Sequence, residues 1–271
     1  MNFTLKSDTN KPYILDYCIL QNKSEIPALT RKNADFITAV IKLDSNYGKD
    51  ADVKNGPHKT FDPIKSSGGK ECGSTAFWFD KMKNGGDFKS CLAGVIVAID
   101  RVNSTHLEAS VDGRNTIREL ILQTCPTYSK MVAELEKDLR DQNHIIAKIA
   151  APIQAKKRKT SDRYNLSFAS KFCAYAAKYL KTKQQYVIYD QVIASHLPLY
   201  VEAYLSQKSG KKSFDFYSQK NKCIKKHQAV DILGFYREYS NTIEKIIDIV
   251  KSQKISKEEF DHIVWYCLKG K

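Results

Sequence analysis

The chain has 271 residues, 42% of them hydrophobic, which excludes a disordered chain and predicts a folded protein with a sizeable core. Its formal net charge is +14, and the excess lies in residues 151–271, where 23 Lys and Arg stand against 11 Asp and Glu; residues 1–150 have 21 against 19. Such a one-sided positive charge is typical of proteins that bind polyanions, above all nucleic acid, with general solubility charge as the alternative.

Seven cysteines are present, but none form a Cys-x-x-Cys pair, and neither a His-Glu-x-x-His motif nor an acidic calcium loop occurs. The pattern argues against a disulfide framework or a zinc finger, so we expect no metal and no cofactor. The longest apolar run, Cys91–Ile99, is too short to cross a membrane, and no apolar signal core follows Met1. We therefore expect a soluble, cytoplasmic protein without a membrane partner, and a monomer.

Residues 1–150 are expected to form an N-terminal region. Residues 33–43 predict a short helix from their apolar spacing, and residues 44–75 predict an irregular loop because turn-forming residues are dense there. A second break is expected at Asn84–Asp87. The apolar run Cys91–Ile99 fits a buried strand or a buried helix equally well, since short apolar runs do not distinguish them.

Helical periodicity dominates residues 113–150, with an interruption at Pro126. Pro152 and the cationic run Lys156, Lys157, Arg158 and Lys159 then mark a connection. Four adjacent cations repel one another, so this run is either a strap that contacts phosphates or a solvated linker.

Residues 151–271 are expected to form a basic helical domain. One helix is predicted from about Asn165 to about Leu180, and another opens at Asp190, where Pro198 should kink or split it. A basic stretch with interleaved aromatic residues follows, and two more helices, about Val230 to Lys251 and from near Ser256, close the chain. The fold class expected is mainly α, with two helical subdomains, residues 1–150 and 151–271.

Lys171 lies in the middle of the helix predicted over residues 165–180. Its neighbours three and four positions away are Ser167, Phe168, Ala174 and Tyr175, which combine small and aromatic side chains. An ammonium group in such partly apolar surroundings loses hydration, which favours the neutral, nucleophilic amine. On the helix alone, a solvent-facing lysine without a chemical role is the more common outcome.

Asp190 stands where the next helix begins, and the backbone N–H groups there favour an anion. An ordinary helix cap is the simple interpretation. A rigid, ionised cap carboxylate could also stabilise a developing sugar cation or steer a proton.

The segment with Lys171 in a helix, an apolar Tyr186–Tyr189 stretch and then Asp190 resembles the active-site segment of 8-oxoguanine DNA glycosylases of the helix-hairpin-helix superfamily. It is most similar to the archaeal-type branch and its bacterial relatives, in which Lys-Phe/Met-x-x-Tyr-Ala leads to Pro-x-x-Asp. The resemblance covers roughly residues 164–205. Lys159–Tyr164 stands where that family has a glycine-rich hairpin.

The resemblance implies a cleft between the two subdomains that receives a damaged or modified base turned out of double-stranded DNA. Lys171 would then attack the sugar, Asp190 would offset positive charge on it, and the resulting Schiff base would permit strand cleavage as in an AP lyase. No cofactor is implied.

Other residues are weaker candidates for the same site. Tyr175, Tyr189 and Trp78 could line the base pocket. Core packing is the better interpretation for Tyr175, an equally good one for Trp78 and an open alternative for Tyr189. Cations in the basic segments could contact DNA phosphates: Lys156, Lys157, Arg158, Lys159, Arg163, Lys211, Lys212, Lys222, Lys225 and Lys226.

Three alternatives remain open at the level of sequence. The protein could bind nucleic acid without catalysis and use Lys171 only for a phosphate contact. It could be an RNA-directed module. It could also be a glycosylase that removes modified bases from phage DNA, which keeps the chemistry and changes the biological purpose.

Overall fold

The structure is a computed structural model that describes residues 15–43, 74–102, 105, 107, 112–151, 153–154, 162–205 and 231–269. The described residues are mainly helical, as the sequence predicts, with two short pairs of strands. They fall into two compact units. Unit 1 comprises Met1–Asn46, Asp190–Lys222 and Glu238–Lys271, and unit 2 comprises Tyr47–Tyr189 and Cys223–Arg237.

This division differs from the one expected from charge. The expected boundary between residues 150 and 151 falls inside unit 2, because helix α6 (Ile145–Ile149) packs on helix α7 (Leu166–Leu180) across it. Unit 1 is assembled from three separate stretches of the chain, an arrangement that depends on long-range packing and leaves no local mark in the sequence.

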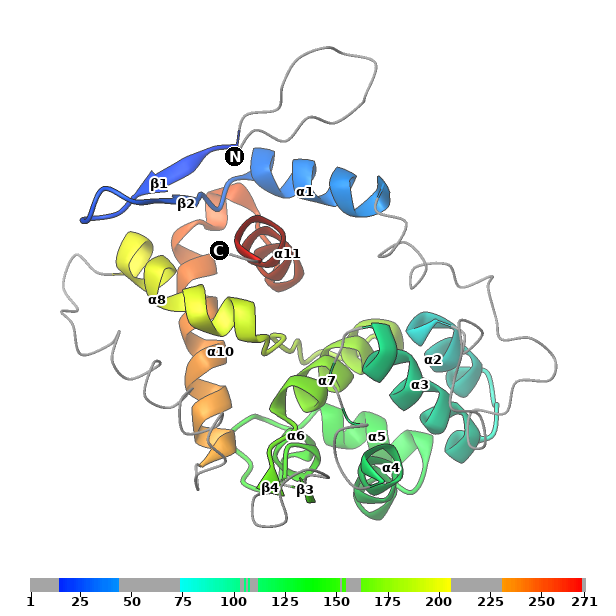
Figure 1. Cartoon of the computed structure of the whole chain (residues 1–271). Helices are drawn as coiled ribbons and strands as arrows, with labels where there is room; N and C mark the ends of the chain where they lie inside the picture. The colour runs from blue at the N-terminus through cyan, green and yellow to red at the C-terminus, as the bar shows by residue number, and fades with distance from the viewer. Residues whose placement is uncertain are drawn as a thin grey trace. The chain divides into compact units, whose positions relative to one another are not determined.

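Helix α7 is the central element of unit 2, where it contacts helices α2, α3, α5 and α6 (Figure 1). Ten of its side chains are buried, which suits a helix surrounded by neighbours. The other elements of unit 2 are α2 (Thr75–Lys83), α3 (Phe88–Val102), α4 (Gly113–Thr124), α5 (Tyr128–Leu135), strands β3 (Ile153–Gln154) and β4 (Asp162–Arg163), and the start of α10 (Ile232–Ile249).

The ambiguous apolar run Cys91–Ile99 is part of helix α3, and all of its residues are buried. Helices α2 and α3 approach closely at Gly94. A Cβ atom there would lie 2.2 Å from the ring of Trp78, so only glycine lets this ring rest on the α3 backbone. The turn between the two helices confirms the break expected at Asn84–Asp87, where Gly85 has a φ of 86°.

The helical pattern over residues 113–150 is confirmed as three helices, α4, α5 and α6. Pro126 separates α4 from α5, as expected, and the side chain of Thr127 caps α5 by accepting from the N–H of Lys130. A further polar stretch precedes α6, which is capped by His144.

Several expected segments lie outside the described residues, namely most of the loop 44–75, the cationic run 156–159 and the basic stretch with aromatic residues. Strands β3 and β4, which flank the cationic run in sequence, pair antiparallel with Ile153 opposite Arg163.

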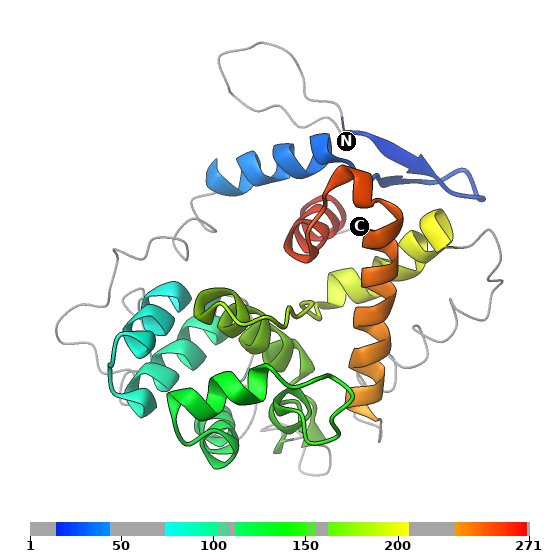
Figure 2. The same cartoon turned by 180° about the vertical axis from the view of Figure 1, so that it is seen from behind.

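Unit 1 is organised around helix α11 (Lys257–Leu268), which contacts α1 (Arg31–Leu43), α8 (Gln191–Leu205) and strand β2 (Glu25–Pro27). In both views of the molecule α11 lies beside α1 (Figures 1 and 2). The remaining elements are strand β1 (Tyr17–Ile19), which pairs antiparallel with β2, most of α10, and the short helix η3 (Lys251–Gln253).

Pro198 lies inside α8, which continues as one helix through it, so the expected split is wrong. A proline inside a helix costs a backbone hydrogen bond, and here apolar packing compensates. Leu197 and Pro198 are buried, and Tyr200, fully buried, donates to the carbonyl of Pro27 over 3.0 Å.

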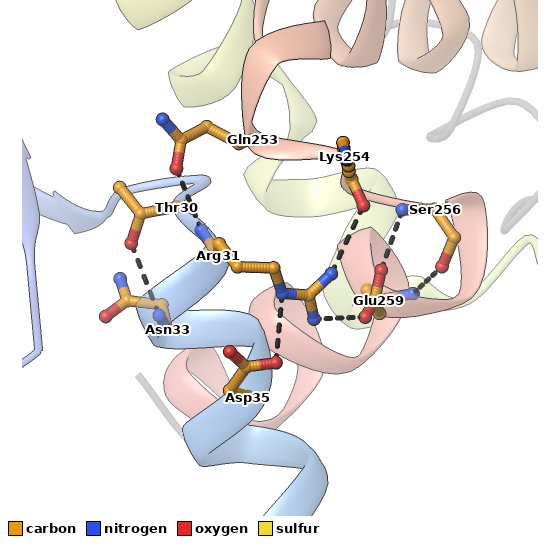
Figure 3. Close-up of polar contacts among 8 residues, drawn as sticks. All are labelled: Thr30, Arg31, Asn33, Asp35, Gln253, Lys254, Ser256 and Glu259. Carbon is orange, nitrogen blue, oxygen red and sulfur yellow. Dashed lines mark hydrogen bonds and ion pairs between the residues drawn. The ribbon is translucent and has the colours of Figure 1, made fainter.

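Arg31, at the start of α1, joins α1 to the chain around η3 and α11 (Figure 3). Its guanidinium donates to Asp35 within α1, to the carbonyl of Lys254 and to Glu259, and its backbone N–H donates to the side chain of Gln253. One side chain therefore bonds to residues more than 200 positions away in sequence.

The partner of Arg31, Glu259, also completes the capping box predicted at Ser256. Ser256 Oγ accepts from the N–H of Glu259, and Glu259 accepts from the N–H of Ser256. Burial raises the pKa of Glu259, but hydrogen bonds from Arg31 and Ser256 outweigh it and hold the pKa below its usual value. Among the described residues, no helix combines the length and apolarity that crossing a membrane requires.

Candidate functional site

Helix α7 begins and ends as the sequence predicts, and Lys171 lies near its middle. The helix has one face that is not buried in unit 2. Its half-buried and exposed members at helical spacing are Ser167, Ala174, Tyr175 and Lys178. Lys171 lies one turn from Ser167 and one turn from Tyr175 along the helix.

Lys171 is itself only 6% exposed, which is unusual for a lysine. Its neighbours along the helix, Ser170 and Phe172, are fully buried, while Ser167 and Tyr175 on its own face are half-buried. Lys171 is therefore shielded from bulk water, while residues one turn away on either side reach the surface.

A short extended segment, residues 186–189, runs beside α7 and ends one residue before Asp190. Its most direct contact is a buried hydrogen bond of 2.9 Å from the backbone N–H of Tyr189 to Ser170 Oγ. Ser170 Oγ also donates to the carbonyl of Ser167, so both hydrogen-bonding capacities of the hydroxyl are used. The bond fixes Tyr189 next to the residue that precedes Lys171.

The same segment is held at its other end. The hydroxyl of Tyr186 donates to the carbonyl of Leu135 over 2.6 Å and lies 3.1 Å from Nε2 of His144. The hydroxyl of Tyr236 donates to the carbonyl of Val187 over 2.7 Å. Hydrogen bonds at Tyr186, Val187 and Tyr189 hold this segment, which leads into Asp190, firmly in place.

His144 is fully buried, and its imidazole links this support to α6. Nδ1 accepts from the N–H of Ile146, and because Tyr186 donates to Leu135, Nε2 carries the proton that is shared with the tyrosine oxygen. Burial lowers the pKa of His144 to about 4, against the smaller raising effects of Asp141 and Glu134. The imidazole is therefore neutral near pH 7.

Asp190 caps helix α8, as predicted. Its Oδ1 accepts from the N–H of Val192 over 2.8 Å, and its carbonyl accepts from Ala194. The carboxylate is half-buried. Lys171 belongs to unit 2, whereas Asp190 is the first residue of a segment of unit 1. The division between the units falls at the peptide bond between Tyr189 and Asp190. The pairing of the two side chains stays a prediction.

Of the three aromatic residues proposed for a base pocket, two are placed in the core of unit 2. Trp78 is 2% exposed against Gly94, and Tyr189 is 5% exposed with its ring edge-on to Phe235 at 5.8 Å. Both Trp78 and Tyr189 therefore pack in the core, which was the alternative role given for each of them. Tyr175 is half-buried, one turn from Lys171 along α7.

Tyr175 ends a stack of rings that begins in the core. The ring of Phe79, fully buried, stacks on Tyr179 at 5.9 Å, and Tyr179 stacks on Tyr175 at 6.4 Å. Lys178 places its Nζ 5.8 Å from the centre of the Tyr179 ring. Fixed neighbours therefore hold both Tyr175 and Lys178 on the outer face of α7.

Most of the cations predicted to bind DNA, in the runs 156–159 and 211–226, lie outside the described residues, and of Arg163 only the backbone in β4 is described. Two residues of the site were missed at the sequence level. Ser170 directly precedes Lys171, and Lys178 lies about two turns further along the same helix. Helical spacing could have indicated Lys178, but the partner of Ser170 depends on tertiary packing.

Within the described part of the chain, no group of three or more His, Cys, Asp or Glu residues is placed to hold a metal ion. Comparison of the chain with protein-family models, with curated proteins and with solved structures gave no match in any of the three.

Proposed function

We propose that this protein is a DNA glycosylase in which the amine of Lys171 attacks the sugar of a damaged or modified nucleotide and the carboxylate of Asp190 stabilises the charge that develops. The observation that carries the proposal is the hydrogen bond between Ser170 and Tyr189. Lys171 directly follows Ser170 in the sequence, and Asp190 directly follows Tyr189.

The surroundings of Lys171 suit a nucleophile. Lys171 is shielded from bulk water, and in the proposed reaction the lone pair of its amine forms the bond to C1′ as the bond from C1′ to the base breaks. The base leaves with the two electrons of the broken bond to C1′ and takes up a proton. Loss of a proton from the amine and opening of the sugar ring, with protonation of its oxygen, give an imine. Removal of a proton from C2′ then expels the 3′ phosphate.

Asp190 suits the partner role because the N–H of Val192, at the α8 N-terminus, holds its carboxylate in place. A fixed anion stabilises positive charge on the sugar without reorganising during the reaction. The net charge of +14 supports a polyanionic substrate, which makes nucleic acid the fitting class.

The test is single-turnover excision from duplexes that carry 8-oxoguanine, with phage DNA containing hypermodified cytosine and single-stranded RNA assayed in parallel. Lys171→Gln should lower excision by about 10³-fold, because no other amine replaces the nucleophile. Lys83→Gln, an exposed lysine in the last turn of α2, is the matched control and should excise like the wild type.

Asp190→Asn separates charge from capping. Asparagine caps helices as well as aspartate, so the fold should persist while excision falls by about 10- to 100-fold. Asp231→Asn is the control, since Asp231 accepts from the N–H of Gly234 at the start of α10. Excision by Lys171→Gln at the wild-type rate would contradict the role of Lys171 as nucleophile. Binding without excision by the wild type on every substrate would instead favour the alternative of a protein that binds nucleic acid without catalysis.

A further inference from the structure

The face of α7 that carries Lys171 continues towards the end of the helix and reaches Lys178, an exposed residue in its last turn. Seven residues separate the two lysines, which is close to two helical turns, so their side chains share one face about 10 Å apart along the axis. Half-buried Tyr175 lies between them.

We propose that Lys178 binds a phosphate of the nucleic-acid strand whose sugar is presented to Lys171. This inference rests on the proposed function and adds a contact to it. A strand that places one sugar at Lys171 carries phosphates on both sides of that sugar. A cation two turns along the same face is positioned for one of these phosphates, while Tyr175 occupies the space between.

The stretch of chain that forms α7 and the segment after it is positively charged, and the carboxylate of Glu136 reaches it only beyond the end of α7, where it accepts from the backbone N–H of Lys183. Residues 166–189, which span α7 and the segment beside it, contain Lys171, Lys178, Lys181 and Lys183 and no Asp or Glu. A phosphate that approaches the outer face of α7 therefore meets cations and no carboxylate from this stretch of chain.

Lys178 is also held in place before any ligand arrives. Its Nζ lies 5.8 Å from the ring centre of Tyr179, and that ring stacks on Phe79 in the core. A side chain oriented in this way loses less conformational entropy on binding than a freely rotating surface lysine. This distinguishes Lys178 from Lys83, which also occupies the last turn of an exposed helix end in unit 2.

Binding to a duplex with a central tetrahydrofuran nucleotide tests the contact, because this abasic-site analogue cannot react with an amine. Fluorescence anisotropy over a series of sodium chloride concentrations gives the slope of log Kd against log salt. Each lysine–phosphate contact contributes about 0.9 to that slope. Lys178→Gln should lower the slope by about one contact, Lys178→Arg should restore it, and Lys83→Gln should leave it at the wild-type value.

A slope for Lys178→Gln equal to that of the wild type would overturn the inference. So would an equal reduction by Lys83→Gln, since the effect would then come from total charge. Neither result bears on excision, and failure of the proposed function is seen separately, as undiminished excision by Lys171→Gln.

Discussion

Ser170 is a single hydroxyl that holds the segment of residues 186–189 against α7 within unit 2. Its Oγ accepts from the buried N–H of Tyr189, and nothing in the composition of α7 distinguishes it from the neighbouring small residues. Its role became evident only from the path of the chain around unit 2, because the partner lies 19 residues away.

We predict that Ser170→Ala destabilises the protein by about 1–3 kcal/mol, because it leaves a buried backbone N–H without a partner. It should also slow excision, since the segment that leads to Asp190 loses an attachment to α7. Ser195→Ala, which removes an exposed hydroxyl bonded only to carbonyls of its own helix, should change neither quantity measurably. Urea unfolding and single-turnover excision measure the two effects. A destabilised Ser170→Ala protein with an unchanged excision rate would contradict a positioning role.

His144 makes the stability of unit 2 depend on pH. The folded imidazole has a pKa of about 4, while the unfolded one titrates near 6.5, so the unfolded chain binds the extra proton between these values. Its contribution is therefore complete above about pH 6.5 and is lost as the pH falls towards 4, by up to roughly 3 kcal/mol.

His144→Asn should remove this dependence. Asparagine can still cap α6 by accepting from Ile146, so the variant folds, but it carries no titrating group. We expect the urea midpoint of the wild type to fall more than that of the variant between about pH 7 and about pH 5. Parallel curves for the two proteins would show that His144 is not the group responsible.

At the scale of elements, the contact between α1 and the segment of η3 and α11 depends on Arg31. The Arg31 side chain is 38% exposed and Asp35 is 69% exposed, so the ion pair between them contributes little to stability. The hydrogen bonds to the carbonyl of Lys254 and to the less exposed Glu259 contribute more.

We predict that Arg31→Ala lowers the free energy of unfolding by about 1–2 kcal/mol and speeds hydrogen exchange of the α1 amides. Arg31→Lys should recover only part of the loss, because a lysine cannot reproduce three divergent N–H bonds. Arg140→Ala serves as the control, since Arg140 is 84% exposed beside Asp138 and should contribute almost nothing. An equal effect of the two alanine variants would show that the contact does not depend on this side chain.

Elements whose signals are local were predictable from sequence. The bounds of α7, the cap at Asp190 and the capping box at Ser256 all depend on neighbours within a few residues, and the structure confirms them. The sequence could not show whether Cys91–Ile99 forms a strand or a helix, because a segment buried on all sides has no apolar periodicity. At Pro198 the sequence predicted a kink or a split, and the split is absent because buried packing overrides the local preference to end the helix.

At the scale of the whole molecule, charge did not predict how the chain is divided. The two compact units interleave segments that lie far apart in sequence, while the expected boundary followed the change in charge near residue 150. The sequence also could not show which of the three candidate aromatic residues are buried in the core. Trp78 and Tyr189 pack in the core and Tyr175 reaches the surface, and only tertiary packing separates them.

The most direct test of the Lys171 chemistry is to trap the protein on DNA with sodium borohydride, which reduces an imine to a stable amine. The wild type and Lys83→Gln should each give a covalent adduct with the duplex on which the wild type excises a base, and peptide mapping should place the DNA remnant on Lys171. Lys171→Gln should give none. An adduct that persists in Lys171→Gln, or excision by the wild type without any adduct, would contradict the account.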